Sequence, residues 1–406
     1  MSPGRGPRFV LAAGALAGLA NTALFPLRNP EQVALASDVY YHAARAALRG
    51  ADVYAVTPVG EAGFRYPPVV ALAFFPHALL GSPLAAFALQ TALNLAALGA
   101  LAVLLVRAVE RGGVALSRTD RALVAAFAFL AGPVGVNLVN GQVNPPLALA
   151  LAAGALFLEA DRDRASGVLF GLAALVKVFP ALVGVWLLRQ RRWRAVAAAT
   201  ATGVLGLAAG LVVFGPGASA TWVTDVLASE SAVASFAGGP DPGAPYSTVR
   251  RQLAFALPGL PADWLLPVGA AVLAPVFAGA NRVVADYRSR LVALAGTLHA
   301  TLLLLPLEPF YAALAVFPTV PLLYLLREGL PRRLLLAGSL LVYVPVTWTS
   351  VTTVAAVLPA AAAEPLTAAA SAGFGFVLPP TVGVWLVLAG CLLAQHRAAS
   401  RTAPDA

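Results

Sequence analysis

Apolar stretches of about 20 residues follow one another along the chain, separated by short polar segments. A helix of that length spans the hydrocarbon core of a bilayer, which is ~30 Å thick. We therefore expect an all-α polytopic membrane protein. The pattern predicts membrane spans at residues 9–27, 83–106, 121–139, 143–158, 194–214, 264–280, 291–307, 310–326, 333–351 and 376–395.

Two further apolar segments, residues 67–80 and 166–188, do not have the pattern of a simple span. The first begins at a Pro-Pro pair, and the second contains Lys177 and Pro180. Proline removes a backbone donor and kinks or breaks a helix. A broken helix at membrane depth needs protein or water to satisfy its freed backbone groups. We expect hairpins or kinked spans that line a cavity, and about ten to thirteen spans in total.

Composition and charge fit a membrane protein with a defined orientation. Hydrophobic residues make up 60% of the chain and charged residues 11%, far fewer charges than a soluble domain carries. The net charge of +9 does not indicate nucleic-acid binding, because the basic residues lie in short loops between the spans. With the N-terminus inside, most of the 27 Lys and Arg residues fall on the inner side, as the positive-inside rule describes.

The resulting topology defines the domain organisation. We expect one transmembrane domain over residues 1–396, cytoplasmic N- and C-termini in a cell membrane, and a disordered tail over 397–406. The outer side then carries two long loops, residues 28–66 and 215–263, and a short turn at 137–145. The single cysteine excludes a disulfide within the chain.

Asp38 is a candidate catalytic group in the first outer loop. One interpretation is that Ser37 or Asp38 caps a helix whose apolar face rests on the membrane interface. The other is that this carboxylate acts as a general base, which takes a proton from an acceptor hydroxyl as that hydroxyl attacks a sugar carbon. The spacing alone leaves both interpretations open.

Lys177 is the only lysine in the chain, and it lies among apolar residues at the predicted helix break. A cation in such surroundings is costly, which makes a functional role the first hypothesis. The side chain either extends to the membrane interface or supplies a point charge that holds a lipid-linked phosphate.

Amide side chains form a second group of candidates in the turn around Gly141. Asn140, Gln142 and Asn144 could bind sugar hydroxyls or phosphate oxygens, and Gly141 would let the backbone approach closely. An ordinary turn between two helices, with an asparagine as a cap, would have the same sequence.

Two further ionisable residues have equally open roles. His299 falls within a predicted span, and Glu308 lies at an outer helix junction, so each is either structural or part of the cavity. His42 and His77 have no partners at metal-ligand spacing, so we expect no metal site. We also expect no cofactor, because no phosphate-binding glycine loop of the nucleotide type is present.

The order of these motifs resembles glycosyltransferase family 87, whose members are GT-C-type mannosyltransferases with a polyprenyl-phosphate sugar as donor. The first outer loop is similar in three motifs, Asp38-x-x-Tyr41, Gly50-x-x-x-Tyr54 and Phe64-Arg65-Tyr66-Pro67-Pro68. Later segments resemble that family in Gly141-Gln142-x-Asn144-Pro145, in the block from Gly171 to Lys177 with Pro180, and, more loosely, in Leu305-Pro306-x-x-x-x-Tyr311.

The resemblance implies a GT-C-like bundle and a role for each matching residue. Asp38 would be the base of an inverting single displacement, Lys177 would contact the donor phosphate, and an extracytoplasmic glycolipid or glycan would be the acceptor. The other implied substrate-binding residues are Tyr41, Arg65, Tyr66, Asn140, Gln142, Asn144, His299, Glu308 and Tyr311. One departure is Leu305, where the family usually has serine, and it weakens the assignment of Glu308 and Tyr311.

Two other functions are compatible with the sequence. A secondary transporter would also have broken helices and a buried cation at its binding site, although we find no paired, inverted set of broken segments. A lipid-binding membrane protein without catalysis is the other alternative, and a cavity that lacks Asp38 and Lys177 would favour it.

Overall fold

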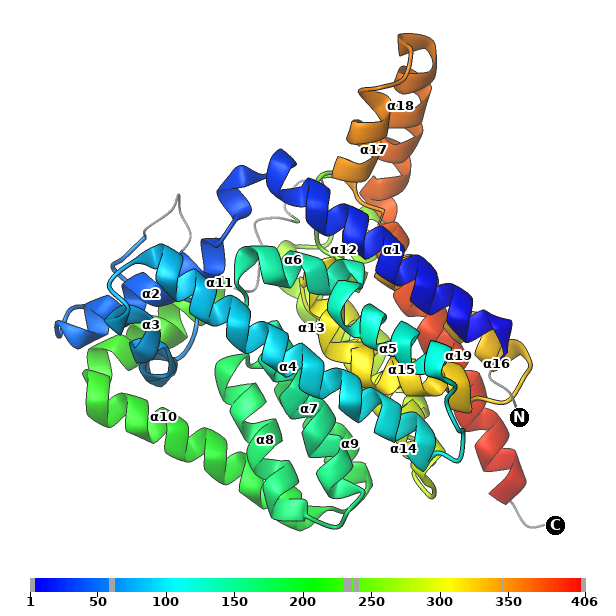
Figure 1. Cartoon of the computed structure of the whole chain (residues 1–406), viewed down its shortest axis with the longest axis horizontal. Helices are drawn as coiled ribbons and strands as arrows, with labels where there is room; N and C mark the ends of the chain where they lie inside the picture. The colour runs from blue at the N-terminus through cyan, green and yellow to red at the C-terminus, as the bar shows by residue number, and fades with distance from the viewer. Residues whose placement is uncertain (1–3, 58–62, 230–235, 237–240, 345, 403–406) are drawn as a thin grey trace.

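The protein is a bundle of α-helices with no β-strand among the residues described here (Figure 1). The computed structural model describes residues 4–57, 63–229, 236, 241–344 and 346–402. Parts of the two predicted outer loops, residues 58–62, 230–235 and 237–240, therefore lie outside the described residues. The all-α fold class predicted from the apolar pattern is confirmed.

Most of the described chain is α-helical, and short 3₁₀ segments and one π-turn connect or extend the helices. The α-helices are α1 (Arg5–Arg28), α2 (Leu35–Leu48), α3 (Phe75–Leu79), α4 (Pro83–Arg111), α5 (Arg118–Leu130), α6 (Gly132–Asn140), α7 (Asn144–Leu158), α8 (Asp163–Val176), α9 (Val183–Arg189), α10 (Trp193–Thr221), α11 (Leu227–Ser229), α12 (Val249–Ala256), α13 (Leu265–Ala280), α14 (Tyr287–Leu304), α15 (Val316–Leu325), α16 (Leu330–Tyr343), α17 (Trp348–Ala355), α18 (Ala360–Phe376) and α19 (Pro379–Thr402). The others are η1 (Pro30–Gln32), η2 (Pro68–Phe74), η3 (Phe179–Leu182), η4 (Trp222–Val226), η6 (Ala262–Trp264) and η7 (Pro309–Ala315).

Fewer helices are long enough to cross a membrane than the sequence pattern predicts. Within the described residues five helices are long and apolar enough, or up to seven if each of two bent pairs counts as one span. The predicted span 121–139 is one such pair, α5 and α6, bent by 44° at Ala131. Other predicted spans, such as 310–326, divide into shorter helices. Prolines account for much of the division, because Pro133 and Pro309 lie at the starts of helical segments there and Pro321 lies inside α15.

The centre of the bundle is formed by α14 and α15. Every residue of α15 is buried, and so is every residue of α14 from Leu291 to Leu303. A helix that is buried all round lies within a core rather than at its surface. At the other extreme, α10 buries only Ala195 and Gly210 and presents its apolar side chains to the surroundings, as a lipid-facing helix does.

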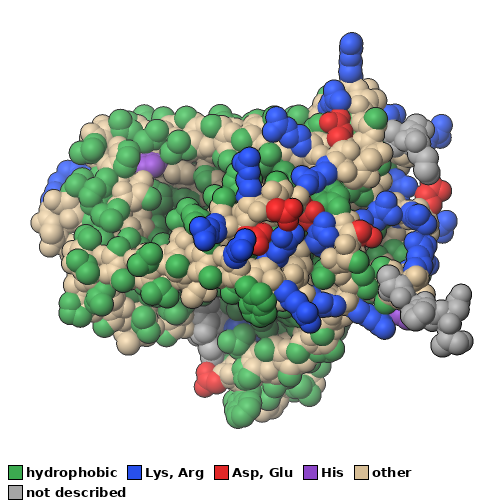
Figure 2. All heavy atoms as spheres, turned by 90° about the horizontal axis from the view of Figure 1, so that it is seen from below, with side chains coloured by type: hydrophobic (Ala, Val, Ile, Leu, Met, Phe, Trp, Pro, Cys, Tyr) green, Lys and Arg blue, Asp and Glu red, His purple; other side chains and the backbone are tan. Residues whose placement is uncertain are grey.

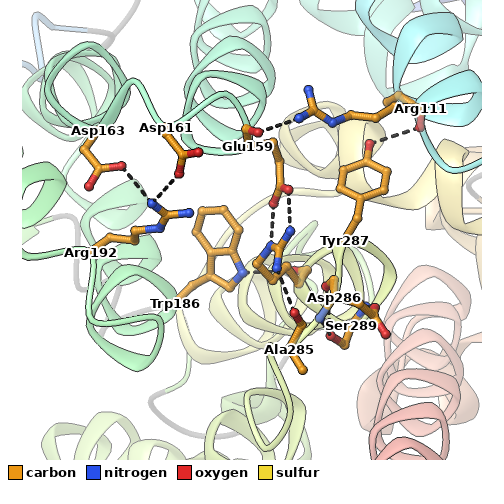
Figure 3. Close-up of polar contacts among 12 residues, drawn as sticks. Arg111, Glu159, Asp161, Asp163, Trp186, Arg192, Ala285, Asp286, Tyr287 and Ser289 are labelled. Atoms are coloured by element: carbon orange, nitrogen blue, oxygen red, sulfur yellow. Dashed lines mark hydrogen bonds and ion pairs between the residues drawn. The ribbon is translucent and has the colours of Figure 1, made fainter.

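The segment 166–188 is a hairpin, as predicted. Helix α8 ends at Val176, and after two residues η3 and α9 lead back. Arg192 follows α9, and its Nη1 lies 2.9 Å from Asp161 Oδ1 and 3.3 Å from Asp163 Oδ1. Asp161 precedes α8, and Asp163 is its first residue. The two ends of the hairpin therefore lie together (Figure 3). The segment 67–80 is likewise broken, into η2 and α3.

One end of the bundle gathers the basic loops and both chain termini. Figure 2 shows Lys and Arg side chains clustered over the half of this face nearest the termini, whereas the other half is mainly hydrophobic. Arg290 pairs with Glu159 at 2.5 Å, Arg111 donates to the Glu159 carbonyl, and the Trp186 indole donates to the Arg290 carbonyl (Figure 3). We call this end of the bundle, which includes Arg111, Glu159 and Arg290, the basic end. The predicted inner loops thus meet on one face.

The C-terminal part differs from the prediction in two places. The predicted span 333–351 is divided between α16 and α17, which are bent by 66°. Helices α17 and α18 together project from the bundle (Figure 1). Helix α19 continues to Thr402, so residues 397–402 are helical and the predicted disordered tail is wrong there. The reason is that helix-forming residues such as Ala398 and Ala399 extend the apolar helix beyond the membrane length.

Candidate active site

A large cavity lies away from the basic end of the bundle. Its volume is about 840 Å³, within the usual range for a ligand pocket. Helix α1 connects the two regions, because Arg8 near its start pairs with Asp120 at the basic end, and Arg28 at its last residue lines the cavity. At 1.5 Å per residue the 24-residue helix is about 36 Å long, roughly the thickness of a bilayer core.

The cavity is positively charged. Of the described residues that line it, four are cations, Arg28, Arg65, Lys177 and Arg250, and one is a carboxylate, Glu308. Apolar and aromatic side chains from α1, α2, η3 and the segment 304–311 supply most of the remaining wall. A pocket with this balance of charges favours an anionic ligand that also carries an apolar part.

Lys177 reaches the cavity because α8 ends immediately before it. Pro180 has no N–H to donate to the carbonyl of Val176, so the α-helical ladder stops and Lys177 takes an extended backbone conformation. Its Nζ donates to the Tyr311 hydroxyl at 3.0 Å and lies 4.4 Å from the centre of the Tyr311 ring and 5.6 Å from that of Tyr66. The two aromatic faces hold the buried ammonium at the cavity wall.

Tyr66 is itself fixed by neighbouring polar groups. Its hydroxyl lies 2.8 Å from that of Tyr40, and Tyr40 donates to Gln142 Oε1 at 3.2 Å. Tyr54 donates to the Tyr66 carbonyl at 2.8 Å, and Phe74 stacks on Tyr40 at a ring distance of 4.2 Å. These contacts connect the first outer loop, α2 and the turn after α6 into one wall.

The turn around Gly141 has the close backbone approach that the sequence predicts. Gly141 has φ 69°, and a Cβ there would lie 2.8 Å from the Cβ of Ser37, so only glycine fits. Asn94 of α4 donates to the Gln142 carbonyl at 2.9 Å, and Gln90 and His77 continue this hydrogen-bonded chain behind the wall. The position of Gln142 is therefore fixed from both sides.

Seven of the predicted site residues line the cavity together: Arg65, Tyr66, Asn140, Gln142, Lys177, Glu308 and Tyr311. Asn140 contacts the first loop there, because its Nδ2 donates to Gln32 Oε1 at 3.1 Å. Glu308 immediately precedes η7, and its carbonyl accepts from the Tyr311 N–H at 3.0 Å. The seven residues come from four separate segments of the sequence and meet in one pocket.

Three of the predicted substrate-binding residues do not line the cavity. Asn144 is fully buried and donates to Asn137 Oδ1 at 2.7 Å, and Asn137 donates to the Phe310 carbonyl at 3.0 Å. Asn144 therefore supports the 308–311 segment from behind. His299 is buried in α14, and its Nδ1 lies 2.8 Å from the Ala295 carbonyl oxygen. The Tyr41 hydroxyl instead accepts a hydrogen bond from Arg45 Nη1 at 2.8 Å.

Asp38 is also outside the cavity lining. Helix α2 turns Ala36, Val39 and Tyr40 toward the cavity. Leu35 also lines the cavity, and with about 3.6 residues per turn Asp38 lies about 60° around the helix from Leu35 and nearly opposite Ala36 and Tyr40. Burial raises the pKa of its carboxyl, and His42 acts in the opposite direction. The role of Asp38 as the base stays a prediction.

The alternative prediction that Ser37 or Asp38 caps α2 is wrong. The helix begins at Leu35, after Ala34, whose φ is 61° and which provides no side-chain cap. The Ala34 N–H donates to the Val139 carbonyl at 2.9 Å, so a contact with α6 fixes the start of α2 upstream of both residues.

The structure adds residues that the sequence did not single out. Tyr40 takes the cavity position expected of its neighbour Tyr41, and Arg28 and Arg250 add positive charge. Arg250 is 2% exposed, and its Nε donates to the Leu304 carbonyl at 3.3 Å. The only sequence signal for Arg250 is its place in a basic pair within an outer loop.

The fold and the cavity together define a polytopic membrane protein with a positively charged pocket among apolar helices. Residues 64–306, more than half of the chain, match glycosyltransferase family 87. The chain belongs to glycosyltransferase family 87. The match includes Arg65, Gln142 and Lys177, and it leaves Asp38 and Glu308 outside its two ends.

One relative is similar over a shorter region. A polyprenol-phosphate-mannose-dependent alpha-(1-2)-phosphatidylinositol pentamannoside mannosyltransferase from Mycolicibacterium smegmatis is 35% identical over 146 residues. That region covers 36% of this chain and 34% of the relative, so the similarity spans about a third of either protein.

Proposed function

We propose that the protein transfers a hexose, mannose in the first instance, from a polyprenyl-phosphate donor to a glycolipid or glycan acceptor. The observation that carries this proposal is the charge of the cavity, with four cations and one carboxylate among its described lining residues. A lipid phosphate supplies the negative charge that this cavity favours, and its isoprenoid chain suits the apolar helices around it. The activity of the mycobacterial relative, a mannosyltransferase, supports mannose as the sugar.

The reaction is a single displacement. The acceptor oxygen attacks the anomeric carbon, the bond from that carbon to the phosphate oxygen breaks, and polyprenyl phosphate departs. Phosphate is a good leaving group, so the protein has to position the two substrates, hold the departing charge and take the proton of the acceptor hydroxyl. Lys177, between the Tyr311 and Tyr66 rings, is placed to hold the charge.

The charge distribution supports an orientation for this reaction. Arginines cluster at the basic end, near both chain termini, and basic loops favour the cytoplasmic side. The cavity then opens toward the extracytoplasmic side of a cell membrane. A polyprenyl-phosphate sugar can serve as donor there without any nucleotide.

The direct test is an assay of the purified protein in lipid nanodiscs with polyprenyl-phosphate-[¹⁴C]mannose and a glycolipid extract as acceptor. We expect label to move from the donor to a product of different chromatographic mobility, and unlabelled polyprenyl phosphate to be released in equal amount. GDP-[¹⁴C]mannose in the same assay should give no product.

Two results would contradict the proposal. Transfer from GDP-mannose alone would indicate a nucleotide-dependent enzyme. In sealed proteoliposomes, movement of intact donor across the membrane, with its sugar–phosphate bond unbroken, would indicate a transporter.

A further inference from the structure

Uncharged amide side chains from the region around the end of α1 line one part of the cavity. Asn21 lies in α1, Asn29 is the residue that ends this helix, Gln32 belongs to η1, and Asn140 is the last residue of α6. Asn140 Nδ2 donates to Gln32 Oε1 at 3.1 Å, so the side chains of η1 and α6 meet at this point. We call these four residues the amide cluster.

A row of contacts connects the amide cluster to the candidate phosphate-binding lysine. The Lys177 ammonium lies 5.6 Å from the centre of the Tyr66 ring, and the Tyr66 hydroxyl lies 2.8 Å from that of Tyr40. Tyr40 in turn donates to Gln142, which is two residues after Asn140 in the same tight turn. A ligand that extends along this row from the ammonium therefore passes the two tyrosines before it reaches the amide cluster.

Helix α1 presents one stripe first to protein and then to the cavity. Gly14 and Gly18 pack so closely on α5 and the bend after it that a Cβ at either glycine would collide there. Asn21, Phe25 and Arg28 continue this stripe at intervals of three or four residues, and all three line the cavity. At 1.5 Å per residue, the cavity part of the stripe extends for about 10 Å. It is therefore longer than the single hexose of a donor requires.

The chemistry of the amide cluster matches sugar hydroxyls. A polar side chain on an apolar helix at membrane depth is costly, so Asn21 indicates a polar ligand on this face of α1. An amide carries both a hydrogen-bond donor and an acceptor, and so does each hydroxyl of a sugar. Asn140 is 6% exposed, and its Oδ1 has no hydrogen-bond partner among the described residues. A hydroxyl of a bound sugar would supply the missing donor.

We propose that the amide cluster is the acceptor subsite, and that it binds the hydroxyl groups of an uncharged sugar at the end of the acceptor glycan. This inference rests on the proposed function. With the donor phosphate at Lys177, the donor sugar lies beside Tyr66 and Tyr40, and the acceptor sugar approaches from the α1 side. One acceptor hydroxyl then faces the anomeric carbon, and the others bond to the amides. The inference is independent of which carboxylate takes the proton.

The test measures the apparent KM for each substrate separately in the nanodisc assay. The donor is polyprenyl-phosphate-[¹⁴C]mannose, and the acceptor is the glycolipid extract, whose concentration is expressed by mass. Asn21→Leu and Asn140→Leu each replace an amide with an apolar side chain of similar size. We expect each to raise the apparent KM for the extract by about 3- to 10-fold, the effect of losing hydrogen bonds to a neutral ligand. The KM for the donor should stay within about twofold of the wild type.

A control variant and a folding criterion make the comparison decisive. Gln190→Leu removes an amide that follows α9 and donates to the Trp186 carbonyl, away from the cavity, and it should change neither KM. Asn21 is half-buried on an apolar helix, so leucine there should fold like the wild type. If Asn140→Leu does not elute as a monodisperse protein, Asn21→Leu carries the test.

The outcomes distinguish this inference from the proposed function. An active wild type whose folded variants keep the same KM for the extract overturns the acceptor subsite. A KM for the donor that rises as much as that for the extract, or more, also overturns it, because the amides would then bind the donor sugar. A wild type that transfers no sugar from any polyprenyl-phosphate donor overturns the proposed function and this inference with it.

Discussion

Replacing Lys177 with glutamine should lower the rate of sugar transfer by about 10²–10³-fold, the effect of removing one group that stabilises charge in a transition state. Lys177 is the only lysine in the chain, and its Nζ lies between the rings of Tyr311 and Tyr66. Glutamine is polar and only one atom shorter, but it has no charge to offer the departing phosphate. The initial rate of label transfer from polyprenyl-phosphate-[¹⁴C]mannose measures the effect.

Two other variants separate the charge of Lys177 from its shape. Lys177→Arg keeps the charge, but its planar guanidinium does not fit the tyrosine pair in the same way, so we expect partial activity. Arg118→Gln removes an exposed cation at the start of α5 and should have no effect on transfer. A Lys177→Gln protein that transfers sugar at the wild-type rate would show that the phosphate is held elsewhere.

The largest effect on stability is expected at Arg251, the buried neighbour of the cavity residue Arg250. Its guanidinium is fully buried, and it donates to the carbonyls of Phe374 at 2.6 Å, Asp241 at 3.0 Å and Tyr246 at 3.4 Å, and to that of Ala244. Arg251 therefore holds α12, α18 and the segment 241–246 together. Loss of a charged donor costs about 1.5–3 kcal/mol for each hydrogen bond, before any relaxation.

We expect Arg251→Gln to destabilise the protein by about 3 kcal/mol or more. The protein is heated in detergent, and size-exclusion chromatography then gives the temperature at which half of the monodisperse protein is lost. Arg250→Gln provides the matched comparison, because Arg250 is the neighbouring buried arginine on the same helix, and its Nε donates to the Leu304 carbonyl at 3.3 Å. A smaller loss for Arg251→Gln than for Arg250→Gln would contradict the structural role of Arg251.

Several features of the site were predictable because they depend on local chemistry. Proline has the same effect on a helix wherever it occurs, so the break after α8 and the position of Lys177 at that break followed from Pro180. Gly141 likewise marked a turn, because its φ of 69° is unfavourable for other residues. The basic loops predicted to share one side also lie together, as the contacts of Arg111 and Arg290 show.

Other features could not be predicted because they depend on packing between distant segments. The face that α2 turns to the cavity is set by contacts such as that of Ala34 with Val139. A rotation of the helix by one residue brings Tyr40 rather than Tyr41 to the cavity. The placement of Arg250 in the cavity wall was also hidden, since an arginine in a loop is more often solvated than buried.

Fewer of the described helices reach the length of a span than the apolar pattern predicts, for a related reason. An apolar window near 20 residues predicts burial in lipid or in protein, and the hydropathy of a segment does not distinguish the two. Helix α15 is apolar because the rest of the bundle surrounds it. Its ten residues are too few to cross a bilayer without the preceding η7.

The most direct measurement is a cryo-electron microscopy map of the protein in nanodiscs with a bound polyprenyl phosphate. We expect the phosphate density in the cavity between Lys177 and Arg65, with a phosphate oxygen about 3 Å from Lys177 Nζ and Glu308 facing the space left for the sugar and acceptor. Phosphate density at the basic end, beside Arg111 or Arg290, would contradict a donor site at Lys177.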